Sequence, residues 1–402
     1  MLRRILFWLH LTCGVAAGLV VLMMSVTGVL LAYERQILAA VDRVHYAEPA
    51  PGAARRPLEE LLAAAQRARS GFQPTTIMLR NEPGAPVTFA AGRASAVLVD
   101  PYTASVREPA AAGLRELFET VEGWHRWFNV SGDGRATARA VTGACNLVFL
   151  VLVLSGTYLW LPRTWQWAAF KTRLLFNANT AGKARDFNWH HVLGIWSALP
   201  LAVVVATAVV FSFPWANALV YRSVGEQPPV RGGPPGGAPA TRSAEREPAN
   251  GSAPPRLSYE QLFARAAAQD EWRTLTLALP AASTARFTID QGNGGQPQRR
   301  HTLTLDATTG EVQSWAPFSS QAPGQRLRSW IRFLHTGEAL GLAGQTVAAL
   351  VSATSVVMVW TGLALAWRRL IVPLVRRANY VRMGRTDGRS VTRLTSRDAG
   401  SA

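Results

Sequence analysis

Histidine is the residue type in this chain whose chemistry and placement suggest a function, because neutral imidazole is a common ligand of iron, copper and zinc. The 402 residues include seven histidines and two cysteines. Both cysteines, Cys13 and Cys145, lie in apolar runs, so neither a disulfide framework nor a cysteine zinc site is expected. Any metal chemistry therefore depends on the histidines, which are His10, His45, His125, His190, His191, His301 and His335.

The composition indicates a membrane protein with sizeable water-exposed portions. Hydrophobic residues make up 49% of the chain and the mean hydropathy is +0.08, which is too apolar for an ordinary soluble protein. The net charge of +17 comes mostly from arginine. These arginines flank apolar segments and form no patch interleaved with aromatic residues, so nucleic acid is excluded as a partner.

Four apolar runs are long enough to cross a bilayer, which needs about 20 mostly apolar residues. They are Leu6–Tyr33, Val141–Leu161, Val192–Trp215 and Val347–Trp367. The first run follows two arginines, as in a signal peptide. Its apolar stretch exceeds the roughly 7–15 residues of a signal sequence, so a retained span is expected.

Basic residues near the span ends predict the orientation. The loop 163–187 has five of them against the single acid Asp186, and arginine is abundant from Arg368 to the end. Both termini and this loop are therefore expected in the cytoplasm, and the loops 34–140 and 216–346 outside. The Arg/Ala-rich composition suggests a bacterium, whose inner membrane would place those loops in the periplasm.

The two halves of the chain resemble each other, which indicates an internal repeat. The second span ends in SGTYLWLPR (155–163) and the fourth in TGLALAWRR (361–369). The outer loops match as well: each has an amphipathic helical pattern, then alternating strand residues around an Asp-x-x-Thr turn. The expected fold is a four-transmembrane-helix bundle built from two parallel repeats, with two small α+β extracytoplasmic domains.

The topology sorts the histidines into two levels. His10 and the adjacent pair His190 and His191 fall at the cytoplasmic face, whereas His125 and His335 fall at the outer face. Each transmembrane helix thus has a histidine expected at its N-terminal end. Four histidines in two leaflet pairs can bind two b-type haems, His10 with His190 and His125 with His335. Alternatively, each histidine is an ordinary residue of the membrane interface.

Small residues follow three of these histidines on the same helical face, where a porphyrin would lie. Positions four and eight residues later are Gly14 and Gly18 after His10, Gly194 and Ala198 after His190, and Ala339 and Ala343 after His335. His191 is followed by Ile195 and Leu199, which would block a porphyrin, so His190 is the expected ligand. His125 is followed by Asn129 and Asp133, which are not small. Its assignment as a haem ligand therefore depends on its symmetry with His335. Close packing of helices in lipid is the competing explanation for the small residues.

Other side chains could serve the same sites. Haem propionates need cationic partners, and Arg126 and Arg332 are available at the outer face. The tryptophans Trp124, Trp127 and Trp330 could line a substrate site, although tryptophan is also enriched at membrane interfaces.

The chain resembles the PepSY-associated transmembrane family, often described as iron-regulated membrane proteins. The matching stretches, in order, are WLHLTCGVAAG, VDPYTASV, WHRWF, SGTYLWLPR, NWHHVLGIW, LDATTGEV, LHTGEALG and TGLALAWRR. The resemblance implies PepSY-type outer domains. Some members are inner-membrane ferric-siderophore reductases that hold haem on membrane histidines.

The expected division of the chain follows from the spans and this resemblance. It is a first transmembrane helix at 6–38, a PepSY-like domain at 45–115, an interfacial segment and second helix at 120–162, a cytoplasmic loop at 163–187, a third helix at 188–216, a disordered Pro/Gly-rich linker at 225–256, a second PepSY-like domain at 257–318, an interfacial segment and fourth helix at 325–369, and a basic tail at 376–402.

The functional expectation is haem-dependent electron transfer across the membrane that reduces a ferric siderophore or other ferric chelate in the periplasm. No dinucleotide fingerprint is present, so the reductant is expected to bind a cytoplasmic protein or to be a quinol. The alternative is a non-enzymatic PepSY protein that regulates or binds a periplasmic partner such as a peptidase. A transporter is disfavoured because no span has an acidic residue in its apolar centre.

Overall fold

The computed structural model describes residues 1–46, 48, 52–92, 95–229 and 256–376. Most of the expected linker 225–256 and tail 376–402 lies outside the described residues. The chain divides into two compact units. The first, here called the span unit, comprises Met1–Val29, Gly123–Ala208 and Ala348–Ala402; the second, the sheet unit, comprises Leu30–Glu122 and Val209–Val347.

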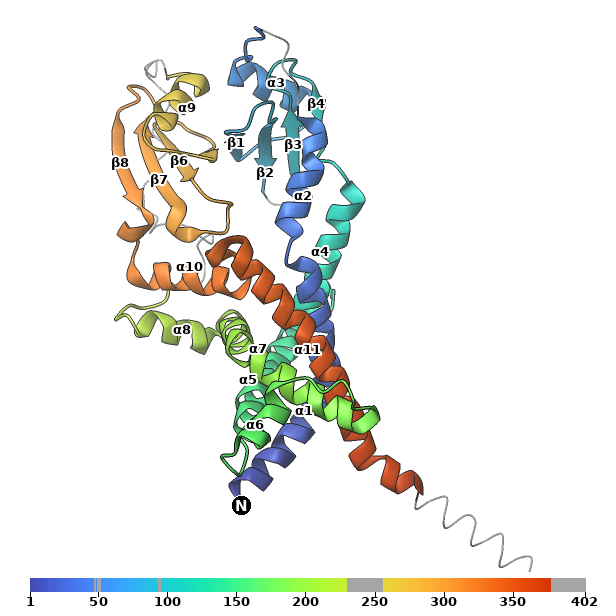
Figure 1. The fold of residues 1–402 in the computed structure, drawn as a ribbon. Helices are drawn as coiled ribbons and strands as arrows, with labels where there is room; N and C mark the ends of the chain where they lie inside the picture. Colours follow the sequence, from blue (N-terminus) through green and yellow to red (C-terminus); the bar gives the residue numbers. More distant parts are fainter. Residues whose placement is uncertain (47, 49–51, 93–94, 230–255, 377–402) are drawn as a thin grey trace, which may run out of the picture. The chain divides into compact units, whose positions relative to one another are not determined.

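Among the described residues, four helical stretches are long and apolar enough to cross a membrane, as the sequence predicts. They are Leu2–His45, Gly134–Trp160, Gly182–Ser212 and Glu338–Arg376. Their main helices are α1 (Leu2–Leu31), α5 (Gly134–Trp160), α7 (Gly182–Ser212) and α11 (Gly341–Leu370) (Figure 1). A helix satisfies its own backbone hydrogen bonds, which a chain in lipid requires.

Apolar side chains and a few polar contacts hold the helices of the span unit together. Leu201 and Val205 of α7 pack with Val351 of α11. The side-chain amide of Asn146, on α5, donates to the backbone carbonyl of Val205 at 3.2 Å. A short helix, α6 (Trp167–Leu174), lies in the loop between α5 and α7.

The sheet unit contains one eight-stranded antiparallel sheet in the order β4-β3-β2-β1-β5-β6-β7-β8. The strands are β1 (Thr76–Arg80), β2 (Val87–Ala91), β3 (Ser95–Val99), β4 (Val106–Arg107), β5 (Thr274–Ala278), β6 (Thr284–Asp290), β7 (Arg300–Asp306) and β8 (Val312–Pro317). Helix α3 (Leu58–Ala68) precedes the first four strands and α9 (Tyr259–Ala267) the last four, in the two amphipathic segments that the sequence predicts to be helical (Figure 1).

The strands of the two outer segments pair directly through β1 and β5. Their register runs from Thr76 opposite Ala278 to Arg80 opposite Thr274, so Met78 and Thr276 stand opposite each other at the centre. The sequence predicted two outer α+β domains but not the pairing of their strands in one sheet. Pairing β1 with β5 removes two exposed strand edges, which would otherwise favour aggregation.

One hydrophobic core lies against the sheet and includes residues of both halves. It combines buried side chains of both helices, such as Leu61 and Leu262, with alternate residues of the strands, such as Phe89 and Phe287. The two Asp-x-x-Thr turns form as expected. The carboxylate of Asp100 accepts from the backbone N–H groups of Tyr102 and Thr103, and Asp306 accepts in the same way from Thr308 and Thr309.

The remaining helices correct the expectation that each span begins with a histidine. His125 lies in α4 (Ala112–Trp127) and His335 ends α10 (Pro323–His335), both separate from the spans α5 and α11. After α10, Gly337 has φ 75° and Gly341 has φ 67°, a left-handed conformation that stops a helix. Ala339 and Ala343 therefore do not follow His335 on one helical face, and that part of the prediction is wrong.

The last described helices complete the sheet unit. They are α2 (Glu34–Asp42), α8 (Pro214–Arg222) and the short 3-10 turns η1 (Arg43–His45), η2 (Pro297–Arg299), η3 (Phe318–Ser320) and η4 (Glu338–Leu340).

Candidate functional site

The imidazole rings of His10 and His190 lie next to each other in the span unit. Their centroids are 6.4 Å apart and their planes are nearly perpendicular, at 88°. An imidazole nitrogen binds a first-row metal at about 2.0–2.1 Å, and the ring centre lies about 1.1 Å behind that nitrogen. Two imidazoles on opposite sides of one metal ion would thus have centroids about 6.3 Å apart. The observed separation fits a shared metal.

The hydrogen bonds of His10 fix which ring nitrogen carries the proton. Its Nδ1 lies 2.9 Å from the hydroxyl oxygen of Ser155 on α5. That hydroxyl donates its single hydrogen to the backbone carbonyl of Val151, at 2.6 Å. The hydroxyl must therefore accept from Nδ1, which leaves Nε2 of His10 unprotonated. An unprotonated Nε2 is the form that binds a metal.

His190 is held in the same protonation state by α11. Its Nδ1 lies 3.1 Å from the backbone carbonyl of Met358, which can only accept, and 3.1 Å from the hydroxyl of Thr361. Thr361 in turn donates to the carbonyl of Val357 at 2.8 Å. Within the described parts of the chain, neither His10 nor His190 forms a hydrogen bond through Nε2.

Glycine follows each of these hydroxyl residues and leaves room for the ring. A Cβ atom on Gly156 would lie 3.1 Å from Cε1 of His10, and one on Gly362 would lie 3.2 Å from Cε1 of His190. Both distances are shorter than ordinary van der Waals contact. The sequence showed these pairs only as part of the repeated span ends, so their role was missed, although the repetition was a visible signal.

His191 differs from its neighbour. Its Nδ1 donates to the carbonyl of Phe187 on its own helix at 2.8 Å, and its ring packs on that phenylalanine at 4.0 Å. The rings of His190 and His191 are also 6.4 Å apart, but consecutive residues of a helix do not face each other. Of the two, His190 is the one held by a neighbouring helix and turned toward His10.

His125 repeats the pattern at the other end of α1. Its Nδ1 lies 2.9 Å from the hydroxyl of Thr27, which donates to the carbonyl of Met23 at 2.7 Å. A Cβ atom on Gly28 would lie 3.6 Å from Cε1 of His125. His335 belongs to the sheet unit, where its ring meets Phe211 edge-on at 5.4 Å. The relative positions of the two units are not determined, so the pairing of His125 with His335 stays a prediction.

The glycines expected to pack on haem meet side chains of other helices. Cβ atoms added at Gly14, Gly18 and Gly194 would lie 3.9, 3.2 and 3.5 Å from Leu152, Leu363 and Met358, respectively. Helix packing is therefore sufficient to explain these three small residues, and their contact with a cofactor stays a prediction.

The expected propionate and substrate residues lie among aromatic side chains. In the span unit the guanidinium carbon of Arg126 is 4.8 Å from the ring of Trp127, while Trp124 is 45% exposed. In the sheet unit the guanidinium carbon of Arg332 is 5.6 Å from the ring of Phe333. Trp330 lines an open groove of about 360 Å³ together with Val224, Gln298, Phe318, Ser319, Pro323, Arg326 and Leu327.

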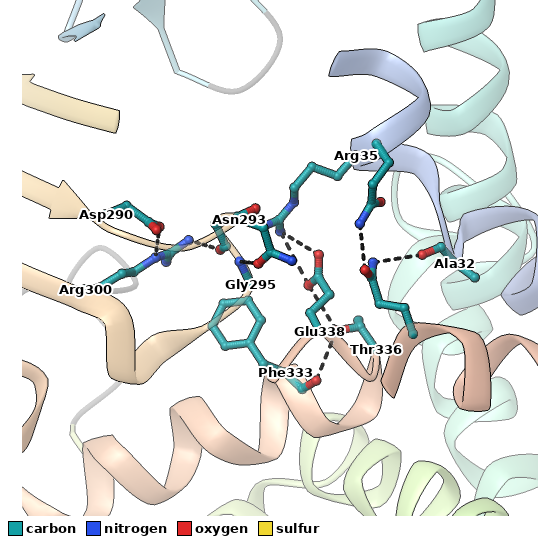
Figure 2. Close-up of polar contacts among 12 residues, drawn as sticks. Ala32, Arg35, Asp290, Asn293, Gly295, Arg300, Phe333, Thr336 and Glu338 are labelled. Carbon is teal, nitrogen blue, oxygen red and sulfur yellow. Dashed lines mark hydrogen bonds and ion pairs between the residues drawn. The ribbon is translucent and has the colours of Figure 1, made fainter. Parts of the chain in front are cut away.

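A second polar cluster lies in the sheet unit, where Figure 2 shows Arg35 of α2 reaching toward Glu338 of η4. The buried Glu338 carboxylate pairs with Arg35 at 3.2 Å and accepts from the hydroxyl of Thr336 at 3.0 Å. Nearby, Arg300 pairs with the buried Asp290 at 2.8 Å. Both acids are thus neutralised by arginine, which is the arrangement expected of a structural contact.

The donor set of the span unit suits haem better than a protein-only metal site. Among the described residues, no group of three or more His, Cys, Asp or Glu side chains could hold a metal ion. A zinc site needs three or four protein ligands, whereas a six-coordinate haem iron needs only two axial ligands. His10 and His190 are two side chains that could serve as such ligands.

One family model matches this chain. It is described as a PepSY-associated TM region and covers residues 7–369, which contain both histidines and both of their hydroxyl partners. No curated protein matches the chain.

Proposed function

Because this chain belongs to the PepSY-associated transmembrane family, we propose that it is a haem-b electron-transfer protein of the bacterial inner membrane. Its two halves would be parallel repeats, with both termini in the cytoplasm and the sheet unit in the periplasm. The electron acceptor would be a ferric siderophore or another ferric chelate. The observation that carries the proposal is the pair of His10 and His190, whose rings are 6.4 Å apart.

His10 and His190 would be the axial ligands of one haem, and His125 and His335 those of a second. When bound, haem supplies a one-electron couple, which the amino-acid side chains here cannot provide. The protein holds each ligand by hydrogen bonds. The Ser155 hydroxyl accepts a hydrogen bond from Nδ1–H of His10. The Met358 carbonyl and the Thr361 hydroxyl accept one from Nδ1–H of His190. These bonds leave Nε2 available and orient the ring.

The surrounding residues support binding and access. A bilayer around the span helices would exclude water from the inner site, which would limit side reactions and favour a defined potential. Arg126 and Arg332 would contact haem propionates. The electron donor would be a cytoplasmic protein or a quinol of the bilayer.

Reduction explains how iron would be released. Fe(III) binds hard oxygen ligands tightly, and Fe(II) binds them less well, so a one-electron reduction weakens the complex with an oxygen-donor chelator. The groove beside Trp330 is the candidate docking surface, because Trp330 and Phe318 offer apolar contact and Arg326 offers positive charge to an anionic chelate.

The test is the absorption spectrum of the purified full-length protein from haem-replete cells. A Soret band, with sharp α and β bands after dithionite, is expected. His10→Ala and His190→Ala should each lose about half of the haem, and the matched control His191→Ala should keep it. A folded but colourless protein would refute the proposal and favour the non-enzymatic alternative, in which the protein binds a periplasmic partner.

A further inference from the structure

Each span helix contains at least one hydroxyl residue followed by a small residue; α5, for example, has Thr142–Gly143 as well as Ser155–Gly156. Four of these pairs, one on each helix, are Thr27–Gly28, Ser155–Gly156, Thr207–Ala208 and Thr361–Gly362. Three of the hydroxyls lie within hydrogen-bond distance of a histidine Nδ1 on another helix, at 2.9, 2.9 and 3.1 Å. The same contact thus recurs on three helices.

The direction of each hydrogen bond is the same. Thr27, Ser155 and Thr361 each donate to the backbone carbonyl four residues earlier, at 2.7, 2.6 and 2.8 Å. Each hydroxyl therefore presents a lone pair to its histidine and cannot donate to it. The contact selects the Nδ1–H form in all three cases.

Other hydroxyl residues of the spans lack this arrangement. Thr157, two residues after Ser155, also donates to the carbonyl four residues earlier, at 2.8 Å, and is exposed. Thr12 on α1 bonds only to carbonyls of its own helix, at 2.8 and 3.1 Å. Back-bonding is thus ordinary for hydroxyl residues in these helices, and the histidine contact is what distinguishes Thr27, Ser155 and Thr361.

We propose that Ser155 and Thr361 are positioning residues that set the ligand strength of His10 and His190 through the Nδ1 hydrogen bond, an inference that rests on the proposed haem function. A hydrogen bond from Nδ1–H makes Nε2 a stronger donor to the metal. A stronger donor stabilises the ferric state and lowers the reduction potential.

The hydrogen bonds of His10 and His190 differ in a way that can be measured. Ser155 is the only partner of Nδ1 in His10 within the described residues, whereas Nδ1 of His190 keeps the Met358 carbonyl if the Thr361 hydroxyl is lost. Removing the Ser155 hydroxyl should therefore have the larger effect.

The spacing of the repeat extends the inference to Thr207. Thr27 follows His10 by 17 residues, and Thr207 follows His190 by the same 17 residues. Thr207 also donates to the carbonyl four residues earlier, at 2.7 Å. The sequence repeat thus matches Thr207 with Thr27.

The experiment compares Ser155→Ala and Thr361→Val with the control Thr157→Val, and includes the conservative rescue variants Ser155→Thr and Thr361→Ser. Haem affinity of the apoprotein, the reduction potential and the low-spin electron paramagnetic resonance spectrum are measured. Loss of such a partner costs about 10- to 100-fold in metal affinity. Ser155→Ala should fall in that range with a more positive potential, Thr361→Val should change less, and the rescue variants and control should resemble the wild type.

The outcomes separate this inference from the proposed function. Wild-type affinity and potential in both Ser155→Ala and Thr361→Val, with haem lost in His10→Ala, would overturn the inference and leave the proposed function intact. Unchanged haem in His10→Ala and His190→Ala would overturn the proposed function itself. If Ser155→Ala does not fold, Thr361→Val, which keeps the shape of threonine, decides the question.

Discussion

The contact between Gly156 and His10 gives a sharp test of the inner site through the substitution Gly156→Ala. The added methyl would lie 3.1 Å from Cε1 of His10, a few tenths of an ångström inside ordinary contact. The ring cannot simply turn away, because Ser155 holds its Nδ1 at 2.9 Å. Inserting a methyl into a packed site costs about 1–3 kcal/mol. At about 1.4 kcal/mol per factor of ten, haem should bind about 5- to 150-fold more weakly.

The assay is titration of haem into the apoprotein, with thermal unfolding of the apoprotein as a check on folding. Thr157→Ala is the comparison on the same helix, since Thr157 is exposed and its hydroxyl bonds to the carbonyl of Val153 in its own helix at 2.8 Å. Thr157→Ala should bind haem within about twofold of the wild type. Wild-type affinity in Gly156→Ala would show that the ring does not occupy this position when haem binds.

Two further predictions concern stability. The buried carboxylate of Asp186 pairs with Arg368 at 2.6 Å and with Arg185 at 3.0 Å. Asp186→Ala should therefore lower the free energy of unfolding by about 1–3 kcal/mol, a value reduced from that of a fully buried pair because both arginines are partly exposed. An unchanged melting temperature in detergent would contradict this. The backbone N–H groups of Thr309 and Thr308 hold the pKa of Asp306 in the folded protein below its usual value. The ionised carboxylate therefore stabilises the fold fully at pH values above its unfolded pKa of about 3.9. This stabilisation is lost as the pH falls through the lower pKa of the folded state. Asp306→Asn should remove that part of the acid dependence in thermal unfolding between about pH 5 and pH 2, and an acid limb identical to the wild type would refute it.

Local signals in the sequence were sufficient for the individual elements. The four spans follow from apolar length, α3 and α9 from amphipathic periodicity, and the turns at Asp100 and Asp306 from the preference of aspartate to bond backbone N–H groups ahead of it. Each of these features is decided by neighbours within about a dozen residues.

Features that depend on distant residues were not predictable in the same way. The joint between β1 and β5 pairs Thr76 with Ala278, and nothing in either strand alone specifies the other as its neighbour. The expected helical face after His335 failed because two left-handed glycines, Gly337 and Gly341, interrupt the chain there. The role of Ser155 was missed because its partner, His10, lies on a different helix.

The length of α1 between its two contacts has an electrical consequence. His10 and Thr27 are 17 residues apart on one continuous helix, and at about 1.5 Å per residue this places them about 26 Å apart along its axis. His125, bonded to Thr27, is therefore separated from His10 by most of the roughly 30 Å hydrocarbon core. In the proposed orientation an electron moving outward between these levels crosses most of the transmembrane voltage, which is worth about 2.3 kcal/mol per 100 mV for a full crossing. An inside-negative membrane would thus drive reduction at the outer face, and each electron delivered would partly discharge that membrane.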